Sequence, residues 1–207
     1  MRSVLLQIYN KLLQHYGNQY WWPGEGIEIA IGAILTQQVS WRNVERALKN
    51  LKSNNCIDLK RLIEIPINDL EEFLRPTIYY RQKARTLKRF AEFILKTPNP
   101  SREDLLSIRG IGPETADSIL LYLYKKPYFV VDAYTKRIFQ RLGIKIGNNY
   151  DKIQNFFMEH LPKDVMLYNE YHALIVRHGK ECCTKNEPKC FVCPILSFCL
   201  YGKRRKR

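Results

Sequence analysis

The sequence predicts an all-α protein, and three observations support this fold class. Apolar residues recur at helical spacing through most of the chain. No Asn-Gly or Asp-Gly pair, the strongest short signal of a β-hairpin, occurs in it. The one strand-like run is the short stretch "YFVV" directly before Asp132. A chain with these features is expected to fold from helices alone.

The periodic apolar residues place the helices in chain order. The first predicted helix carries Leu5, Ile8 and Leu12 on one face, with Gln, Asn and Lys between them. This pattern is typical of an amphipathic helix and not of a signal peptide. Helices are expected near residues 3–16, 26–38, 41–52, 58–65, 68–74, 80–96, 102–108, 114–125, 134–142, 151–161 and 164–178.

Polar side chains mark several expected helix starts. Ser40, Asn68 and Ser101 each stand where they could cap the helix that follows. No repeat and no low-complexity linker divides the chain. Its last residues, "GKRRKR", are expected to form a solvated, disordered end that attracts phosphates without specificity.

The overall charge points to a nucleic-acid partner. The 207 residues include 34 Lys and Arg against 20 Asp and Glu, which gives a net charge of +14. Such an excess is the electrostatic footprint of a nucleic-acid binder, although charge that only keeps a protein soluble is the alternative. The 45% hydrophobic and 26% charged residues are typical of a globular protein. No stretch of 18 uninterrupted apolar residues occurs, so we expect no membrane span and an intracellular protein of the cytoplasm or nucleoid.

A group of cysteines late in the chain predicts a metal centre. Four of the six cysteines have the spacing C-x6-C-x2-C-x5-C, at Cys183, Cys190, Cys193 and Cys199. Four thiolates this close can surround either zinc or a [4Fe-4S] cluster. A zinc ribbon usually has two C-x2-C knuckles and this chain has one, which favours the cluster. Cys182 is a spare neighbour that could replace Cys183, and Cys56 is expected to be a small buried apolar residue.

The stretch "LLSIRGIGPETADSILLYL" predicts a helix, a tight Gly-Ile-Gly turn and a second helix. Gly110 and Gly112 would let the backbone approach a phosphate at the positive end of that second helix. The alternative is an ordinary corner between two helices. Further along, Asp132 follows the apolar run and precedes another helix. It could be a helix N-cap, or a carboxylate held where positive charge develops in a reaction.

The hairpin, Asp132 and the cysteine spacing together resemble the endonuclease III superfamily. These are DNA glycosylases named for a helix-hairpin-helix and a Gly/Pro-rich loop that ends in an aspartate. The stretch "ILTQQVSW" is similar to the family's first barrel helix, "YYRQKARTL" to its Tyr-x-x-Lys-Ala helix and "HGKECC" to the approach to its iron–sulfur loop. The resemblance extends over nearly the whole chain.

The resemblance implies a helix-hairpin-helix DNA glycosylase fold, with two helical domains and the active site between them. A six-helix barrel domain would span 25–131, with the helix-hairpin-helix over 102–125. A discontinuous domain would combine 1–24 with 132–207 and carry an iron–sulfur loop over 183–199. The implied cofactor is a [4Fe-4S] cluster, the implied partner is double-stranded DNA that contains damaged bases, and we expect a monomer.

The resemblance assigns the main catalytic role to Asp132. Loss of the base leaves an oxocarbenium-like sugar, which a fixed carboxylate stabilises while it orients or deprotonates water. Bifunctional members carry a lysine two residues after the second hairpin glycine, and that lysine forms a Schiff base with the sugar. This chain has Glu114 there, and a carboxylate cannot form an imine. We therefore expect a monofunctional DNA glycosylase of base excision repair, without lysine-dependent AP lyase activity.

The resemblance also implies positions that contact DNA. Gln38 matches a glutamine that fills the space left by the flipped base, and Tyr79 matches a wedge position beside it. Ile78 is a departure in the wedge loop, because the family often has Gly there. The hairpin is expected to contribute four DNA-binding residues, Gly110, Ile111, Gly112 and Thr115.

Three stretches, "AILTQQVSW", "RPTIYYRQKA" and "GIGPETADSILLYLYKK", look most like the endonuclease III-like 3-methyladenine DNA glycosylases. N-alkylated purines such as 3-methyladenine and 7-methylguanine are cationic, and aromatic faces can hold a cation. The candidate rings are Trp21 or Trp22 on one side and Trp41 on the other, although packing is the commoner fate of a tryptophan. Glu114 could touch the cationic base, but we expect it only to favour the first turn of its helix.

Two other functions remain open at this point. One is a glycosylase for oxidised or mismatched bases, of the endonuclease III or adenine-mismatch type. The other is a non-catalytic protein that binds damaged DNA through the hairpin and a basic surface. A binder would tolerate Asp132→Asn, whereas an enzyme would lose base release and keep its affinity for DNA.

Overall fold

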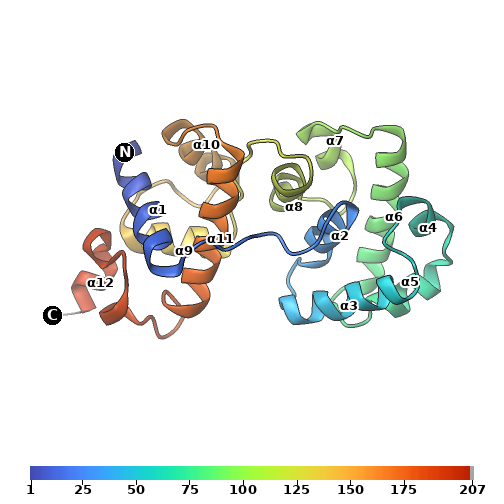
Figure 1. Ribbon diagram of the computed structural model, residues 1–207, viewed down its shortest axis with the longest axis horizontal. Helices are drawn as coiled ribbons and strands as arrows, with labels where there is room; N and C mark the ends of the chain where they lie inside the picture. Colours follow the sequence, from blue (N-terminus) through green and yellow to red (C-terminus); the bar gives the residue numbers. More distant parts are fainter. Residues whose placement is uncertain (206–207) are drawn as a thin grey trace. The chain divides into compact units, whose positions relative to one another are not determined.

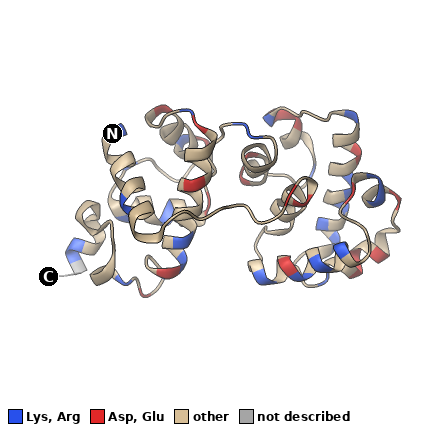
Figure 2. Ribbon diagram, in the orientation of Figure 1, with Lys and Arg blue, Asp and Glu red and all other residues tan. Residues whose placement is uncertain are grey.

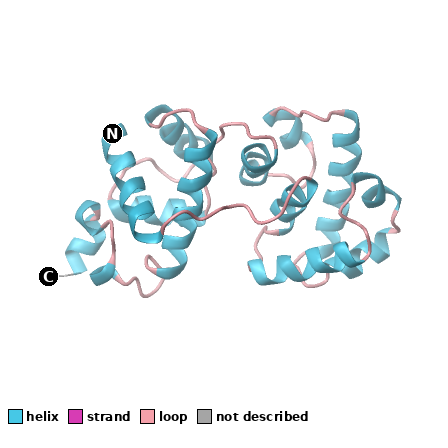
Figure 3. Ribbon diagram, viewed as in Figure 1, coloured by secondary structure: helices cyan, strands magenta, loops and turns pink. Residues whose placement is uncertain are grey.

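The computed structural model describes residues 1–205, and its regular elements are helices (Figure 1; Figure 3). No strand occurs among these residues, and the "YFVV" stretch has no regular secondary structure. The predicted all-α fold class is therefore confirmed. The chain forms two compact units, one over Trp22–Lys125 and one made of Met1–Trp21 together with the chain from Lys126 onward. We call them the hairpin unit and the terminal unit.

The hairpin unit is organised around α2. Its helices are α2 (Ile27–Leu35), α3 (Trp41–Ser53), α4 (Leu59–Glu64), α5 (Ile67–Leu74), α6 (Tyr80–Lys96), α7 (Arg102–Ser107) and α8 (Pro113–Ser118), which continues as a π-helical turn over Ile119–Leu123. Every residue of α2 from Ile29 to Leu35 is buried. A helix that is apolar on all sides belongs in a core, and α2 packs against α3, α6 and α8.

The long helix α6 is amphipathic. It buries one face that includes Leu87, Phe90 and Ile94, and both α4 and α5 pack against it. Lys and Arg recur along its length (Figure 2). Helix α6 begins directly after Tyr79, and its Thr86 lies against Gly110 in the turn between α7 and α8, so this helix supports both turns.

The terminal unit joins the two ends of the chain. It contains α1 (Arg2–Tyr16), α9 (Ala133–Leu142), α10 (Tyr150–His160), α11 (Val165–Glu181) and the short α12 (Leu200–Arg205). The predicted first helix is confirmed, because Leu5, Ile8 and Leu12 are fully buried and α1 packs against α11. The Tyr171 hydroxyl on α11 donates a hydrogen bond to the Leu5 carbonyl at 2.9 Å.

The predicted helix caps have mixed outcomes. Ser101 is confirmed, since its hydroxyl accepts the Asp104 N–H while the Asp104 carboxylate accepts the Ser101 N–H. Asn68 is wrong as a cap, because α5 already begins at Ile67 after Pro66, whose fixed φ suits a helix entry. Ser40 occupies the cap position of α3, but its side chain makes no capping hydrogen bond.

The basic end of the chain is partly helical. Residues 202–205 belong to α12, so the expectation of a disordered end is wrong for them. The Gly202 N–H donates to Cys199 Sγ at 3.3 Å, and the Arg141 guanidinium lies 4.8 Å from the centre of the Tyr201 ring. The second contact joins α12 to α9, and the two helices pack against each other. Lys206 and Arg207 lie outside the described residues. Within the described part of the chain, no helix combines the length and the apolar content needed to cross a membrane.

Candidate functional site

Asp132 stands on a rigid support in the terminal unit. The three residues before it, over 129–131, belong to no helix or strand and are buried. The Gln154 side-chain amide donates to the Phe129 carbonyl at 2.8 Å, and the Phe129 ring stacks on Phe157 at 4.1 Å with an interplanar angle of 4°. Because both the backbone and the side chain of this segment are fixed, the position of Asp132 is fixed as well.

The Asp132 carboxylate is itself held from two sides. Its Oδ1 accepts the Thr135 N–H at 2.7 Å and the Thr135 hydroxyl at 2.9 Å, and its Oδ2 lies 3.5 Å from His172 Nε2 on α11. The interpretation of Asp132 as the N-cap of α9 is confirmed. Burial alone would raise the pKa of this carboxyl, but the hydrogen bond and charge of His172 and the two bonds from Thr135 outweigh it and lower the pKa. The group is thus an anion at neutral pH, although it is only 9% exposed.

His172 was not expected from the sequence. It lies on α11, far from Asp132 along the chain, so no local spacing pointed to it. Thr135 had a signal, because the third residue after an N-cap is the usual hydrogen-bond partner of the cap.

The helix-hairpin-helix of the hairpin unit is tied together by an ion pair. Arg102 on α7 donates to the buried Asp117 on α8 through two nitrogens, at 2.8 and 3.2 Å. Gly110 in the turn has φ of 106°, and an added Cβ would overlap the Thr86 hydroxyl on α6. Glycine is therefore required at 110 for both conformation and close approach.

The other predicted hairpin residues differ in exposure. Gly112 is exposed, has an ordinary φ of −96°, and an added Cβ would meet nothing within 4 Å. Glu114 is exposed in the first turn of α8. Ile111 and Thr115 are each only 5% exposed, so they offer little surface to a ligand outside the protein.

Gln37, which the sequence did not single out, connects two of the predicted DNA-binding segments. Its side-chain amide donates to the Gly110 carbonyl at 3.1 Å and to the Thr115 hydroxyl at 2.9 Å. Its neighbour Gln38 is exposed and has a left-handed backbone, with φ of 55°. Tyr79, the residue before α6, is also left-handed, with φ of 58°, and 58% of it is exposed.

The tryptophans of the hairpin unit form one aromatic group. Trp22 meets Trp41 edge to face at 5.2 Å and 90°, and it lies 5.1 Å from the buried Tyr122. The Trp41 indole N–H donates to Glu45 at 2.9 Å. Trp22 and Trp41 are each partly exposed. Their rings are perpendicular, so holding a base between two faces requires one of them to turn. Trp21 belongs to the terminal unit.

All four predicted metal ligands line one cavity in the terminal unit. Apolar residues such as Ile195 and Leu196 form part of its wall, together with Arg141, His178 and Cys182. The Arg141 guanidinium donates to Cys183 Sγ at 3.3 Å. An added Cβ on Gly202 would overlap Leu196 and come within 3.7 Å of Cys190 Sγ. The sequence-predicted set, Cys183, Cys190, Cys193 and Cys199, is thus brought together around one space.

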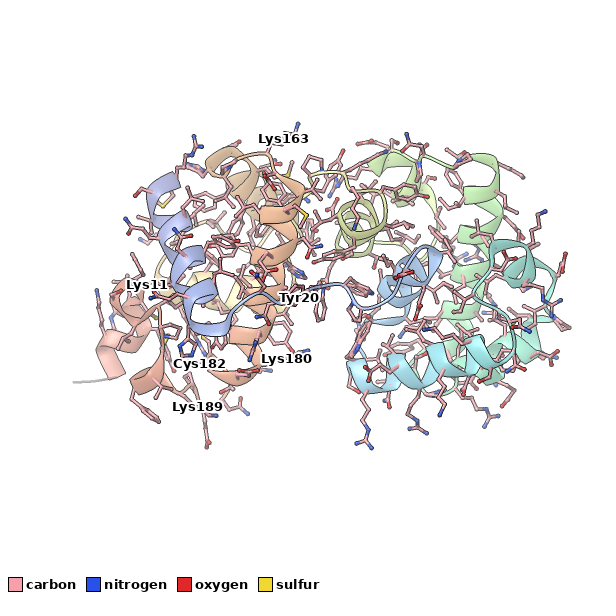
Figure 4. All side chains as sticks on the ribbon, viewed as in Figure 1. Lys11, Tyr20, Lys163, Lys180, Cys182 and Lys189 are labelled. Carbon is pink, nitrogen blue, oxygen red and sulfur yellow. The ribbon has the colours of Figure 1, made fainter. Side chains whose placement is uncertain are left out.

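A closer group of donors includes residues outside that set. The ligand atoms of His178, Cys182 and Cys193 lie within 4.8 Å of one another. The Tyr16 hydroxyl is 3.0 Å from His178 Nδ1, which leaves Nε2 facing Cys193 Sγ at 3.8 Å. Cys182 stands at the end of α11, with Lys189 on the loop that follows (Figure 4). The helical spacing of His178 and Cys182 is a signal that could have indicated this pair.

Residues 31–163 match the HhH-GPD superfamily of base excision DNA repair proteins. The chain belongs to this superfamily. It is 45% identical to a protein of Methanocaldococcus jannaschii predicted to be a DNA repair glycosylase, and the match covers 96% of both chains. The resemblance to endonuclease III inferred from the sequence is therefore confirmed, and the protein is a base excision repair DNA glycosylase of this superfamily.

Two solved structures show the same fold. A trapped endonuclease III–DNA covalent intermediate matches with a TM-score of 0.88 and 22% identity, over 100% of this chain and 99% of that one. The 3-methyladenine DNA glycosylase of H. pylori, bound to 1,N6-ethenoadenine, matches with a TM-score of 0.77 and 31% identity, over 87% of this chain and 97% of that one. The helix-hairpin-helix DNA glycosylase fold predicted from the sequence is thus confirmed.

Proposed function

We propose that this HhH-GPD protein is a monofunctional DNA glycosylase that hydrolyses the N-glycosidic bond of N-alkylated purines and leaves the strand intact. The observation that carries the proposal is the exposed carboxylate of Glu114 at the hairpin position where bifunctional members have their lysine. A carboxylate cannot attack C1′ of the sugar to form an imine. Lys125 and Lys126 follow only after α8 and the π-helical turn, too far along to take its place.

In this proposal Asp132 is the catalytic carboxylate. As the bond to the base breaks, positive charge develops on the sugar, and a fixed anion nearby stabilises that charge. Thr135 and His172 hold the carboxylate, so little reorientation is needed during the reaction. Its lowered pKa keeps it able to orient water or accept a proton from it at neutral pH.

The aromatic group of the hairpin unit supports a cationic purine as the substrate. The partly exposed Trp22 and Trp41 give electron-rich rings, backed by the buried Tyr122, and Glu45 places a carboxylate next to the Trp41 indole. A cation gains from both kinds of group, whereas a neutral oxidised pyrimidine gains only from stacking. The similarity to the H. pylori 3-methyladenine DNA glycosylase favours the same substrate class. Glu114, exposed in the same unit, remains a candidate for the rim of this pocket.

The proposed partner is double-stranded DNA that contains the damaged base. The net charge of +14 supplies the general attraction to phosphates. Gly112 has no intramolecular reason to be a glycine, since its φ is ordinary and an added Cβ would meet nothing. A glycine there leaves room for a phosphate to approach the backbone of the hairpin. Gln38 and Tyr79 are proposed to enter the duplex, because both are exposed on turns of the same unit.

The proposed cofactor is a [4Fe-4S] cluster held by Cys183, Cys190, Cys193 and Cys199, which line one cavity. The cavity fits such a group, because the four side chains surround it and the Arg141 and Gly202 N–H groups donate to sulfur at its edge. When bound, the cluster would supply four thiolate links that order a loop too short to build its own core. Cys182 and His178 would then stand beside the ligand Cys193.

The test is the release of free base from matched duplexes. Each duplex carries one lesion, either 3-methyladenine, 7-methylguanine, uracil, an oxidised pyrimidine or an adenine mismatch. The proposal predicts release of the two methylated purines and little release of the others. Faster release of an oxidised or mismatched base would support that class of glycosylase instead. DNA binding without release of any base would support a non-catalytic binder.

A further inference from the structure

Lys83 is a buried cation in the middle of the hairpin unit. It lies on α6 and is only 3% exposed. Its Nζ donates to the Leu35 carbonyl at 2.8 Å and to the Gln37 carbonyl at 2.9 Å. Burial lowers the pKa of this amine to about 8, which reflects the cost of taking an ammonium group out of water. An apolar residue of similar length would avoid this cost but could not donate hydrogen bonds to the two carbonyls.

The two carbonyls that Lys83 binds lie on either side of Thr36. Leu35 is the last residue of α2, and its carbonyl has no partner in the next turn of the helix. Gln37 immediately precedes Gln38, whose left-handed backbone is unfavourable for a residue with a side chain. The ammonium group therefore fixes the end of α2 and the peptide that leads into Gln38.

The same segment is connected to the hairpin. The Gln37 side chain donates to Gly110 and Thr115, and the Thr86 hydroxyl on α6 packs against Gly110. Lys83 and Thr86 are neighbours on one face of α6. One helix thus sets the Gln38 turn through Lys83 and the hairpin turn through Thr86.

We infer that Lys83 is a positioning residue for base extrusion, because its ammonium group holds Gln38 where that side chain fills the space left by the flipped base. The inference rests on the proposed function, since that function gives Gln38 its role. Lys83 touches no reacting atom. Its effect on the reaction passes through the Gln37–Gln38 backbone.

The chain contains a matched control on the same helix. Lys88 on α6 donates its Nζ to the Ile63 carbonyl at 2.7 Å and to the Ile65 carbonyl at 2.5 Å. It closes the end of α4 in the way that Lys83 closes the end of α2. No predicted DNA-binding residue lies on the turn that it holds. Lys88→Met therefore measures the effect of releasing two such carbonyls on α6 at a turn where no DNA contact is proposed.

The experiment compares wild type, Lys83→Met, Lys88→Met, Gln38→Ala and the double variant Lys83→Met/Gln38→Ala, each checked by circular dichroism. In single-turnover base release, Lys83→Met should be slower by about tenfold, the size of coupling found within one contact network, whereas Lys88→Met should match wild type. In the Gln38→Ala background, Lys83→Met should have almost no further effect. Equal losses in Lys83→Met and Lys88→Met, or losses that multiply in the double variant, would overturn the inference.

A second readout does not depend on which base is released. A duplex with 2-aminopurine opposite a tetrahydrofuran abasic analogue reports by fluorescence whether a side chain fills the gap. Wild type and Lys88→Met should change this fluorescence, and Lys83→Met and Gln38→Ala should not. A normal change with Lys83→Met would overturn the inference, whereas a wild-type protein that fills the gap but releases no methylated purine would contradict only the proposed substrate. If Lys83→Met does not fold, Lys83→Gln, which keeps a donor, is measured in its place and should be intermediate.

Discussion

The helices α8 and α9 begin in opposite ways. The cap of α9 is Asp132, whose own carboxylate accepts the Thr135 N–H. The cap of α8 is Gly112, which has no side chain, and no side-chain capping bond forms there. We call the start of α9 closed, because the capping carboxylate is held by the helix N–H that it accepts. We call the start of α8 open, because no side chain binds its N–H groups, and the positive end of the helix can attract an anion from outside. In the proposed function, the Asp132 carboxylate at the start of α9 is the catalytic anion, and the start of α8 at Gly112 binds a DNA phosphate.

The largest expected effect on base release comes from changing Asp132, the cap of α9. Asp132→Asn keeps the size of the side chain and removes its charge, so we expect base release to fall by about 10²–10⁴-fold while DNA affinity stays within a factor of about two. Single-turnover release and a binding titration measure the two quantities.

Asp164→Asn is the matched control for that variant. Asp164 caps α11 in the same way, accepting the Leu167 N–H at 2.9 Å, but it is exposed and is assigned no chemistry. Because Asn caps a helix about as well as Asp, this variant should change stability by less than about 0.5 kcal/mol and leave base release unchanged. Full turnover in Asp132→Asn would remove the catalytic role of Asp132.

The start of α8 is tested by two substitutions that each add one methyl group to a glycine of the hairpin turn. Gly110→Ala should lower the free energy of unfolding by about 2–4 kcal/mol, because the added Cβ meets Thr86 and φ is left-handed. Gly112→Ala should change stability by less than about 0.5 kcal/mol, since the Cβ meets nothing. It should nevertheless weaken DNA binding. Denaturant unfolding and a binding titration separate the two effects, and unchanged DNA affinity in Gly112→Ala would argue against a phosphate at this turn.

Local patterns and tertiary packing explain what could be predicted from the sequence. Asp132 could be predicted as a cap because it is a polar residue between an apolar run and a helix. The Gly-Ile-Gly turn could be predicted from its own residues. His172 and Lys83 could not be predicted, because their partners come from other helices. Asn68 failed as a cap because Pro66 starts the helix earlier.

The end of the chain shows the same limit. The spacing of the four cysteines was enough to place them around one cavity. It could not indicate α12, a short basic helix that depends on contacts with Cys199 and Arg141. Nor did it indicate that His178 and Cys182 come close to Cys193.

A smaller effect on catalysis is expected from the cysteine centre, which belongs to the terminal unit and is separate from both helix starts. Cys193→Ala should lose iron and acid-labile sulfide and melt at a lower temperature, whereas Cys56→Ala, a buried cysteine elsewhere, should keep its iron. At a temperature where both cysteine variants are folded, Cys193→Ala should reduce the rate of base release by less than Asp132→Asn does. Zinc in place of iron in anaerobically purified wild type would contradict the cluster.

The smallest expected effect concerns pH. The pKa of Asp132 is lowered from its ordinary value of 3.8. The ionised carboxylate therefore stabilises the folded state at any pH above 3.8, and this stabilisation is lost only as the pH falls through the lowered pKa of the folded protein. Between about pH 5 and pH 7 neither stability nor base release should decline through protonation of Asp132. A pH profile of single-turnover release checks this. An inflection in that range that moves in Asp132→Glu would show that the carboxyl is not an anion there.

The most direct test of the central claim is to follow the base and the strand in one reaction. Duplex DNA carrying 7-methylguanine is incubated with wild type or with Glu114→Lys, in the presence of borohydride, which traps a Schiff base. We predict that wild type releases the base, leaves the strand intact and forms no trapped complex, whereas Glu114→Lys can form one. Strand cleavage together with a borohydride-trapped complex of the wild-type protein would contradict a hydrolytic glycosylase built on Asp132.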